Sequence, residues 1–351
     1  MLKLLRAVAR FFQDKIGWQR IGFLLSIAII TVAVAVLVHM LHDLDINEVI
    51  AALKATSAHR IALAAVFVAG GYFTLTFYDW FALRTIGHSE IRYRIAALSG
   101  FTSYAVGHNI GATVFTGGAV RYRIYSGYGL TAIDVAKICF VAGLTFWLGN
   151  AAVLGLSVFI EPHAATPITQ LPGWINRGIA VVILGVLFSY LGWVWTAPRE
   201  LGKREWSVTL PNGPSTLVQM CIGVFDLGCC AMAMYMLLPT EPHVGFVTIL
   251  VVFVSATLLG FASHAPGGLG VFDAAMLVAL WQFDKEDLIA GLLLFRLLYY
   301  LVPFVIALTI LGTREIWLNS RRGAEEPAEL KSVPVSAPLR SELEPEQSDQ
   351  R

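Results

Sequence analysis

Long apolar runs separated by short polar segments set the pattern of this chain. A helix needs about 20 apolar residues to cross the hydrocarbon core of a bilayer. Runs of that length lie at about 21–41, 61–83, 138–160, 176–196, 215–238, 244–263 and 288–312. Shorter or glycine-broken apolar stretches lie at about 95–118 and 265–281. The pattern predicts an all-α polytopic membrane protein.

The composition agrees with this prediction and excludes several other classes. Of the 351 residues, 57% are hydrophobic and 14% are charged, whereas globular domains carry about 25% charged residues. The mean hydropathy is +0.69. A net charge of +1 gives no reason to expect a nucleic-acid partner. The four cysteines lie in apolar stretches and show no metal-site spacing, so we expect neither a disulfide scaffold nor a metal site.

Lys and Arg residues gather in alternate connections between the apolar runs. They are frequent at 1–20, 84–94, 121–137 and 199–204 and after the last run, and they are sparse in the other connections. Because cytoplasmic loops of membrane proteins carry an excess of Lys and Arg, we assign the basic segments and both termini to the cytoplasm. The head is basic, but no cleavage site follows the first apolar run, which favours a retained anchor over a signal peptide.

This orientation constrains the two broken stretches. The stretch 95–118 lies between basic segments, so it is expected to enter the membrane as a re-entrant helical hairpin and to turn back near Ile110. Such a backbone is tolerated only where protein or a wet cavity covers it. If 265–281 crosses, the chain has about eight transmembrane helices and the tail is cytoplasmic. If 265–281 also re-enters, the tail lies outside, against the charge rule.

The chain is thereby divided into three parts. Residues 1–20 form a basic cytoplasmic head, and 21–318 form the transmembrane domain. Residues 319–351 are rich in Glu, Pro and Ser and poor in apolar residues, which predicts a disordered cytoplasmic tail.

A short motif occurs twice beside the broken stretches. Residues 100–105 read Gly-Phe-Thr-Ser-Tyr-Ala, and 260–265 read Gly-Phe-Ala-Ser-His-Ala. Broken segments at matching places in two halves of a membrane protein point to a transporter's binding site. The likeness indicates either an internal repeat or chance similarity in a sequence rich in small residues.

Ionisable residues occur where the pattern predicts lipid. Asp79, Asp226, Asp273 and Arg296 lie in or beside apolar segments, where a charge costs about 2.5–3.5 kcal/mol by insertion scales. A lone buried arginine is untenable, so Asp226 or Asp273 is the expected partner of Arg296. These residues form either a helix-locking ion pair or the polar wall of a cavity, and both roles are compatible.

Further candidate binding residues lie near the glycines of the broken stretches. Gly117 and Gly118 precede Arg121 and Arg123, and glycine amides with arginines suit phosphate oxygens. The alternative is that these arginines only orient the protein. His108, Asn109 and His264 are expected either to line the same cavity or to be hydrogen-bonded inside the protein. Tyrosines and tryptophans near the run ends are expected to form interfacial belts, at Tyr78, Trp80, Tyr93, Tyr122, Tyr125, Tyr299 and Tyr300.

These residues resemble one known family. The similarity is carried by the pair Tyr78 and Asp79, the block 109–129, the block Pro-Gly-Gly-Leu-Gly-Val-Phe-Asp at 266–273, Asp226 and Arg296. The family is the lysylphosphatidylglycerol synthase transmembrane region, which includes the flippase part of the multiple peptide resistance factor. The resemblance covers about 15–315 and implies a bacterial inner-membrane protein that moves a phospholipid between leaflets. The chain departs from bifunctional members because it has no synthetase domain, and its last glycine block ends in Asp273 where Glu is common.

The sequence and the resemblance together predict a lipid flippase without enzymatic activity or cofactor. No signature of a hydrolase, protease or kinase is present. Lysyl-phosphatidylglycerol or another anionic or aminoacylated phospholipid is the expected substrate, with a separate lipid aminoacyl synthetase and a homo-oligomer as candidate partners. The alternatives are a secondary transporter of a small polar solute and a non-transporting partner of a lipid-synthesising enzyme. The expected binding residues are Tyr78, Asp79, His108, Asn109, Gly117, Gly118, Arg121, Arg123, Asp226, His264, Gly267, Gly268, Asp273 and Arg296.

Overall fold

A computed structural model describes 56–197, 199–203, 206–263 and 266–332, with isolated positions between 31 and 54. The predicted head at 1–20, nearly all of the run at 21–41, and 333–351 of the predicted tail therefore lie outside the described residues. The described chain is compact up to Ile310, and a second unit begins at Leu311.

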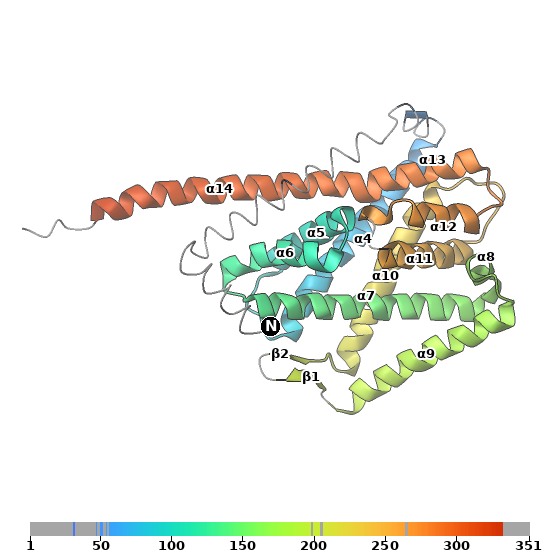
Figure 1. The fold of residues 1–351 in the computed structure, drawn as a ribbon, viewed down its shortest axis with the longest axis horizontal. Coiled ribbons are helices and arrows are strands. Elements are labelled where there is room, and N and C mark those ends of the chain that lie inside the picture. Colours follow the sequence, from blue (N-terminus) through green and yellow to red (C-terminus); the bar gives the residue numbers. More distant parts are fainter. Residues whose placement is uncertain are drawn as a thin grey trace, which may run out of the picture. The chain divides into compact units, whose positions relative to one another are not determined.

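Helices make up most of the described chain (Figure 1). The first half contains α4 (Ala58–Thr85), α5 (Tyr93–Ile110), α6 (Thr113–Tyr125), η1 (Ser126–Tyr128), α7 (Ala132–Ile160), η2 (Pro162–Ala165), α8 (Thr166–Thr169) and α9 (Gly173–Thr196). The second half contains β1 (Glu200–Lys203), β2 (Trp206–Thr209), α10 (Gly213–Leu237), α11 (Phe246–Ala262), η3 (Pro266–Gly268), α12 (Val271–Ala279), α13 (Lys285–Phe295), η4 (Arg296–Leu301) and α14 (Val302–Ser332).

The predicted membrane character is confirmed. Within the described residues, five helices are long and apolar enough to cross a bilayer, namely Ala58–Thr85, Ala132–Ile160, Gly173–Thr196, Gly213–Leu237 and Lys285–Leu318. They match five of the predicted runs. The run at 244–263 forms the shorter apolar helix Phe246–Ala262. The chain is thus a multi-pass helical membrane protein, and the total of about eight spans stays a prediction.

The long helices α4, α7 and α10 pack against one another and form the centre of the first unit. α7 begins at a capping box, in which the backbone N–H of Thr131 donates to Asp134 Oδ2 at 2.9 Å and the backbone N–H of Asp134 donates to Thr131 Oγ1 at 3.3 Å. α7 and α10 cross at glycines. A Cβ placed on Gly149 would lie 2.6 Å from the Cα of Gly223. Small residues therefore set the spacing of this crossing, as is common in membrane helices.

The stretch predicted to turn back forms a helical hairpin. α5 ends at Ile110, Gly111 and Ala112 have φ of 84° and 44°, and α6 begins at Thr113. Thr113 Oγ1 donates to the carbonyl of Gly107 at 3.2 Å and closes the turn. α6 has 13 residues, a length of about 20 Å, which is less than the hydrocarbon thickness of about 30 Å. The hairpin is longer than predicted, because α6 continues to Tyr125 and includes both arginines of the basic segment.

The second broken stretch also forms a helix, a glycine turn and a shorter helix. α11 is followed by Gly267, Gly268 and Gly270, all with positive φ, and then by α12. α12 has nine residues, about 14 Å, which is too short for a crossing on its own. The repeated motif lies inside α5 in the first copy and at the end of α11 in the second, so its two copies do not occupy equivalent positions in their helices.

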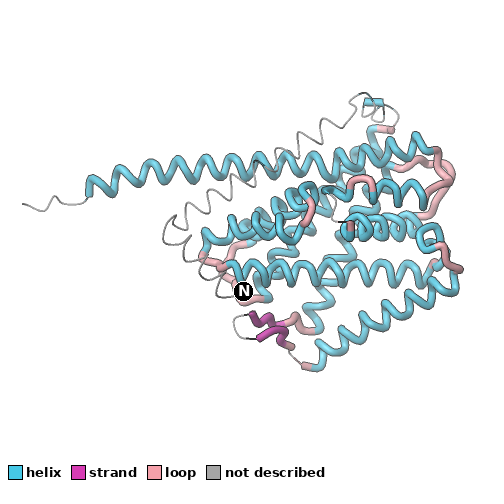
Figure 2. The backbone as a smooth tube through the Cα atoms, viewed as in Figure 1, coloured by secondary structure: helices cyan, strands magenta, loops and turns pink. Residues whose placement is uncertain are grey.

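Two local features differ from the sequence expectations. The described chain is not entirely helical, because β1 and β2 pair as an antiparallel hairpin between α9 and α10 (Figure 2). These strands have four residues each, too few for a clear alternating pattern. In addition, α14 continues to Ser332, so 319–332 of the predicted disordered tail are helical.

Candidate functional site

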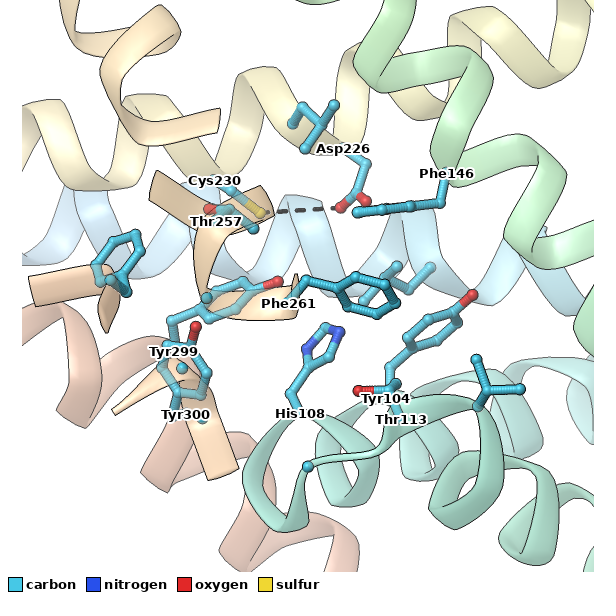
Figure 3. Close-up of a pocket in the computed structure, with 18 of the residues that line it drawn as sticks. Tyr104, His108, Thr113, Phe146, Asp226, Cys230, Thr257, Phe261, Tyr299 and Tyr300 are labelled. Atoms are coloured by element: carbon cyan, nitrogen blue, oxygen red, sulfur yellow. Dashed lines mark hydrogen bonds between the residues drawn. The ribbon is translucent and has the colours of Figure 1, made fainter. Parts of the chain in front are cut away.

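A cavity of about 200 Å³ lies between helices of the first unit (Figure 3). It is formed where α4, α5, α7, α10 and α11 meet the turn at η3 and the π-helical segment η4. Aromatic side chains make up much of its wall, namely Tyr78, Tyr104, Phe115, Phe146, Phe253, Phe261, Phe272, Tyr299 and Tyr300. Polar groups of Asp226, His108, Thr113 and Thr257 also face it. The cavity is thus mainly apolar, with a small number of polar groups, as ligand pockets commonly are.

The tips of the two broken segments meet at this cavity. A Cβ on Gly267 would lie 3.8 Å from the carbonyl oxygen of His108. Asn109 Nδ2 donates to the carbonyl of Tyr300 at 3.2 Å. Because glycine has no side chain, α5 and η4 can approach the backbone of this turn closely. The sequence likeness of the two broken stretches had pointed to such a shared cavity.

The π-helical segment supplies backbone acceptors beside the cavity. A π-helix departs from the i to i−4 pattern of the α-helix and often occurs at functional sites. The carbonyl of Tyr299 accepts a hydrogen bond from Tyr72 Oη at 3.0 Å, and that of Tyr300 accepts one from Asn109. Side chains of α4 and α5 thus bind carbonyl groups of η4.

Asp226 is the buried carboxyl group in the cavity wall. It is 6% exposed. Tyr78 Oη donates to its Oδ2 at 3.1 Å, and Cys230 Sγ lies 3.9 Å from its Oδ1. Within the described chain these bonds come from neutral groups. Figure 3 shows the carboxyl group near the ring of Phe146, on the far side of the cavity from His108.

Beside the cavity, Arg121 and Asp79 form a buried ion pair. Arg121 Nε and Nη2 donate to Asp79 Oδ1 at 2.9 Å and 2.7 Å, and Tyr125 Oη donates to Asp79 Oδ2 at 2.8 Å. The guanidinium carbon lies 4.8 Å from the ring centre of Tyr104, which lines the cavity. Arg121 is 3% exposed and is directed at Asp79, so its guanidinium group is engaged within the protein in this conformation.

Arg296 has the partner that the sequence argument required. Its Nε donates to Asp273 Oδ1 at 3.0 Å, and its Nη2 also donates to Asp273. Asp273 in addition accepts the backbone N–H of Gly270 at 3.1 Å at the start of α12. Of the two predicted candidates, Asp273 is thus the ion partner, and Asp226 is not.

Other predicted binding residues lie away from the cavity wall. A Cβ on Gly117 would lie 3.1 Å from the carbonyl oxygen of Ser103, and a Cβ on Gly118 would lie 3.6 Å from Cys139 Sγ. These glycines therefore pack α6 against its neighbours. Arg123 is half-buried on α6, and His264 lies outside the described residues.

Sequence reasoning misplaced several cavity residues. Tyr299 and Tyr300 were predicted to form interfacial belts, but they line the cavity, and Tyr125 is fully buried beside Asp79. Tyr78 was expected both in a belt and in the binding site, and it lines the cavity. Tyr104 and Thr257 were not singled out. An aromatic residue near the end of an apolar run suits both an interface and an interior, so only tertiary contacts separate the two positions.

The cavity has an apolar rim at the surface of the protein. Its lining includes Val114, Phe115 and Phe261, which are 57%, 81% and 38% exposed. In a membrane protein, exposed apolar side chains of this kind face acyl chains. Among the described residues, no cluster of three or more His, Cys, Asp or Glu side chains could hold a metal ion.

Comparisons with known proteins agree with this architecture. No protein-family model matches the chain. An uncharacterised protein of Synechocystis is 26% identical over 311 residues, which cover 87% of this chain and 96% of the relative. The inner membrane protein YbhN of Escherichia coli is 28% identical over 262 residues, or 71% of this chain and 79% of the relative. A phosphatidylglycerol lysyltransferase of Staphylococcus haemolyticus is 26% identical over 315 residues, but these cover 87% of this chain and only 35% of the lysyltransferase.

Proposed function

We propose that this chain, a homologue of the membrane part of the phosphatidylglycerol lysyltransferases and of YbhN, moves a phospholipid between the leaflets of a bacterial inner membrane. The lipid is anionic or aminoacylated. The name of the lysyltransferase connects that relative to phosphatidylglycerol. The match covers 35% of the lysyltransferase, and a separate synthetase is proposed as the partner that aminoacylates the lipid.

One observation carries the proposal: the cavity combines a few polar groups in its interior with an apolar rim. Asp226 and His108 face the interior, whereas Val114 and Phe115 reach the surface of the protein. A phospholipid needs both environments, because its headgroup must avoid hydrocarbon while its acyl chains stay in it. A transporter of a small polar solute does not need the apolar rim. The apolar rim therefore favours a lipid over a solute.

The α5–α6 hairpin is proposed to enter the bilayer from the cytoplasmic side and to return to it. Basic residues lie at both outer ends of the hairpin, namely Arg92 and Arg94 where α5 begins and Arg121 and Arg123 in the last turns of α6, and α6 is shorter than the hydrocarbon core. The hairpin tip then lies at the depth of the cavity. This arrangement suits the rule that irregular backbone occurs in membranes only where protein or a cavity covers it.

The ion pairs beside the cavity are proposed to change during transport. Arg121 is held by Asp79, so it reaches a phosphate only if the pair opens. Arg123, near the end of the same helix, is the second arginine proposed to bind the phosphate. Asp273 holds Arg296, whose Nη1 would lie 3.8 Å from a Cβ on Gly267 of the glycine turn.

Reconstituted liposomes test the proposal. Vesicles with fluorescent phosphatidylglycerol, an aminoacylated analogue or a neutral lipid are treated with a membrane-impermeant quencher, and the protected fraction is followed over time. Vesicles that contain the protein are expected to lose protection faster than empty vesicles for at least one of the charged lipids. Equal rates for every lipid would overturn the proposal and favour a non-transporting partner of a lipid-synthesising enzyme. Release of a trapped polar solute without lipid movement would favour the solute transporter.

A further inference from the structure

The three aspartates of the predicted site differ in how their charge is balanced. Asp79 is paired with Arg121, and Asp273 is paired with Arg296. In the described part of the chain, Asp226 accepts hydrogen bonds only from the hydroxyl of Tyr78 and the thiol of Cys230. Asp226 is 6% exposed, so its side chain is buried like those of the protein core. A buried carboxylate without a counter-charge is strongly unfavourable. The Asp226 carboxyl group must therefore carry a proton or pair with a cation, and the described chain provides no such cation.

The elements around Asp226 confirm that no protein cation balances it in the described region. Ionisable side chains that share its cavity are Tyr78, Tyr104, His108, Cys230, Tyr299 and Tyr300. No ionisable residue occurs in α11, and Phe146 is the residue of α7 in the cavity wall. His108 is the group in this wall that could become a cation. None of the ion pairs found among the described residues joins its ring to the Asp226 carboxylate. The counter-charge must therefore enter the cavity from outside.

The wall around the carboxyl group is suited to an organic cation. The rings of Tyr78, Tyr104, Phe146 and Tyr299 line the same cavity as Asp226. Aromatic faces attract cations, and aromatic cages are a recurring means of binding ammonium groups. A cavity of about 200 Å³ with an apolar rim admits such a group when it is carried on an acyl chain. A metal ion is less suited, because no cluster of further anionic ligands surrounds Asp226 in the described chain.

We propose that Asp226 is a cation-exchange site, at which the carboxyl group carries a proton in the empty cavity and exchanges it for an ammonium group of the ligand. The O–H bond of the carboxylic acid breaks, the proton leaves to water, and the carboxylate pairs with the entering ammonium group. One positive charge enters as one leaves, so the net charge of the cavity does not change. This inference extends the proposed function, because it links entry of a cationic headgroup to release of a proton.

Binding of a quaternary ammonium amphiphile tests the exchange. Dodecyltrimethylammonium has no ionisable proton, so any proton released on binding comes from the protein. Calorimetric titration of the full chain in a maltoside detergent, in two buffers of different ionisation enthalpy, measures the protons released per bound ligand. We expect a release that approaches about one proton at low pH and weaker binding as the pH falls, because proton and ligand compete for one site. The uncharged analogue dodecyldimethylamine oxide, at neutral pH, is expected to release no proton.

Three variants identify the group that releases the proton. Asp226→Asn keeps the size of the side chain and an acceptor for Tyr78, and it is expected to abolish proton release and to weaken binding about tenfold, since a charged partner is replaced by a neutral one. His108→Gln is expected to retain proton release per bound ligand, whatever its affinity. Asp287→Asn removes an exposed carboxylate of α13 and is the control for net charge. Thermal unfolding in the same detergent verifies that each variant is folded.

Each outcome decides the inference. The inference would be overturned if a folded Asp226→Asn protein still released protons, or if proton release were lost only in His108→Gln. Binding of the ammonium probe without proton release at any pH would also overturn it. Failure of folded wild-type protein to bind the probe would also overturn it. Proton release by a protein that moves no lipid in liposomes would overturn the proposed function and support the exchange site, so the two failures are distinguishable.

Discussion

Arg121 donates two hydrogen bonds to Asp79 Oδ1, from Nε at 2.9 Å and from Nη2 at 2.7 Å, and both side chains are buried. The two residues lie on α6 and α4, so the pair holds the second arm of the α5–α6 hairpin against a long helix. Removal of one member of such a pair leaves an uncompensated buried charge. The hairpin therefore depends on this contact.

We expect Arg121→Gln to destabilise the protein by about 3–5 kcal/mol, because Asp79 then remains buried without its cation. The double change Arg121→Gln with Asp79→Asn is expected to recover much of that loss, since both groups become neutral. Thermal unfolding in detergent measures the difference. Arg94→Gln removes an exposed arginine from α5 and serves as the control. An Arg121→Gln protein as stable as Arg94→Gln would contradict the assigned role of the pair.

The helix crossing at Gly149 and Gly223 gives a second prediction. A Cβ on Gly223 would lie 2.7 Å from the Cα of Gly149, a separation that backbone atoms cannot tolerate without moving. Gly223→Ala is therefore expected to destabilise the protein by about 1–3 kcal/mol or more, as overpacking does.

Gly143 provides the matched control on α7. A Cβ there meets nothing within 4 Å, so Gly143→Ala is expected to be neutral or to stabilise the protein by up to about 1 kcal/mol through helix propensity. Melting temperatures in the same detergent compare the two variants. The crossing would be wrongly assigned if Gly223→Ala melted at the same temperature as Gly143→Ala.

The apolar rim of the cavity predicts an effect on lipid movement. Val114→Trp adds bulk to the rim, and it is expected to slow fluorescent lipid movement in liposomes several-fold without loss of stability. Val66→Trp places the same bulk on the exposed face of α4 and is not expected to slow it. If both variants move lipid at the wild-type rate, the lateral opening is not the route.

The proposed re-entry of α5 and α6 is tested by labelling from either side of the membrane. Cysteines are introduced singly at Glu90, Tyr128 and Trp174, all exposed positions, after replacement of the exposed Cys221 by serine. Glu90 and Tyr128 flank the hairpin and are expected to react from the cytoplasm, whereas Trp174 is expected to react from the opposite side. Reaction of the Tyr128 position only from the opposite side would show that the hairpin crosses the membrane.

The linear pattern of residues was sufficient for several features of this protein. The lengths of apolar runs identified the long helices, because the hydrocarbon thickness fixes how many residues a crossing needs. The basic segments on both sides of 95–118 indicated a turn near Ile110, because cytoplasmic connections carry an excess of Lys and Arg. The cost of an isolated charge in lipid showed that Arg296 needed an acidic partner.

Only the tertiary structure decided which aspartate meets which arginine and which tyrosines line the cavity. Asp79 and Arg121 are 42 positions apart, and Tyr78 and Asp226 are 148 apart, so no local pattern relates them. In a soluble helix, the polar face identifies the side that meets solvent. In a membrane helix, lipid-facing and protein-facing sides are both apolar, so the sequence does not show which side packs inward. The pairing of charges and the position of the cavity follow from how the helices pack against one another.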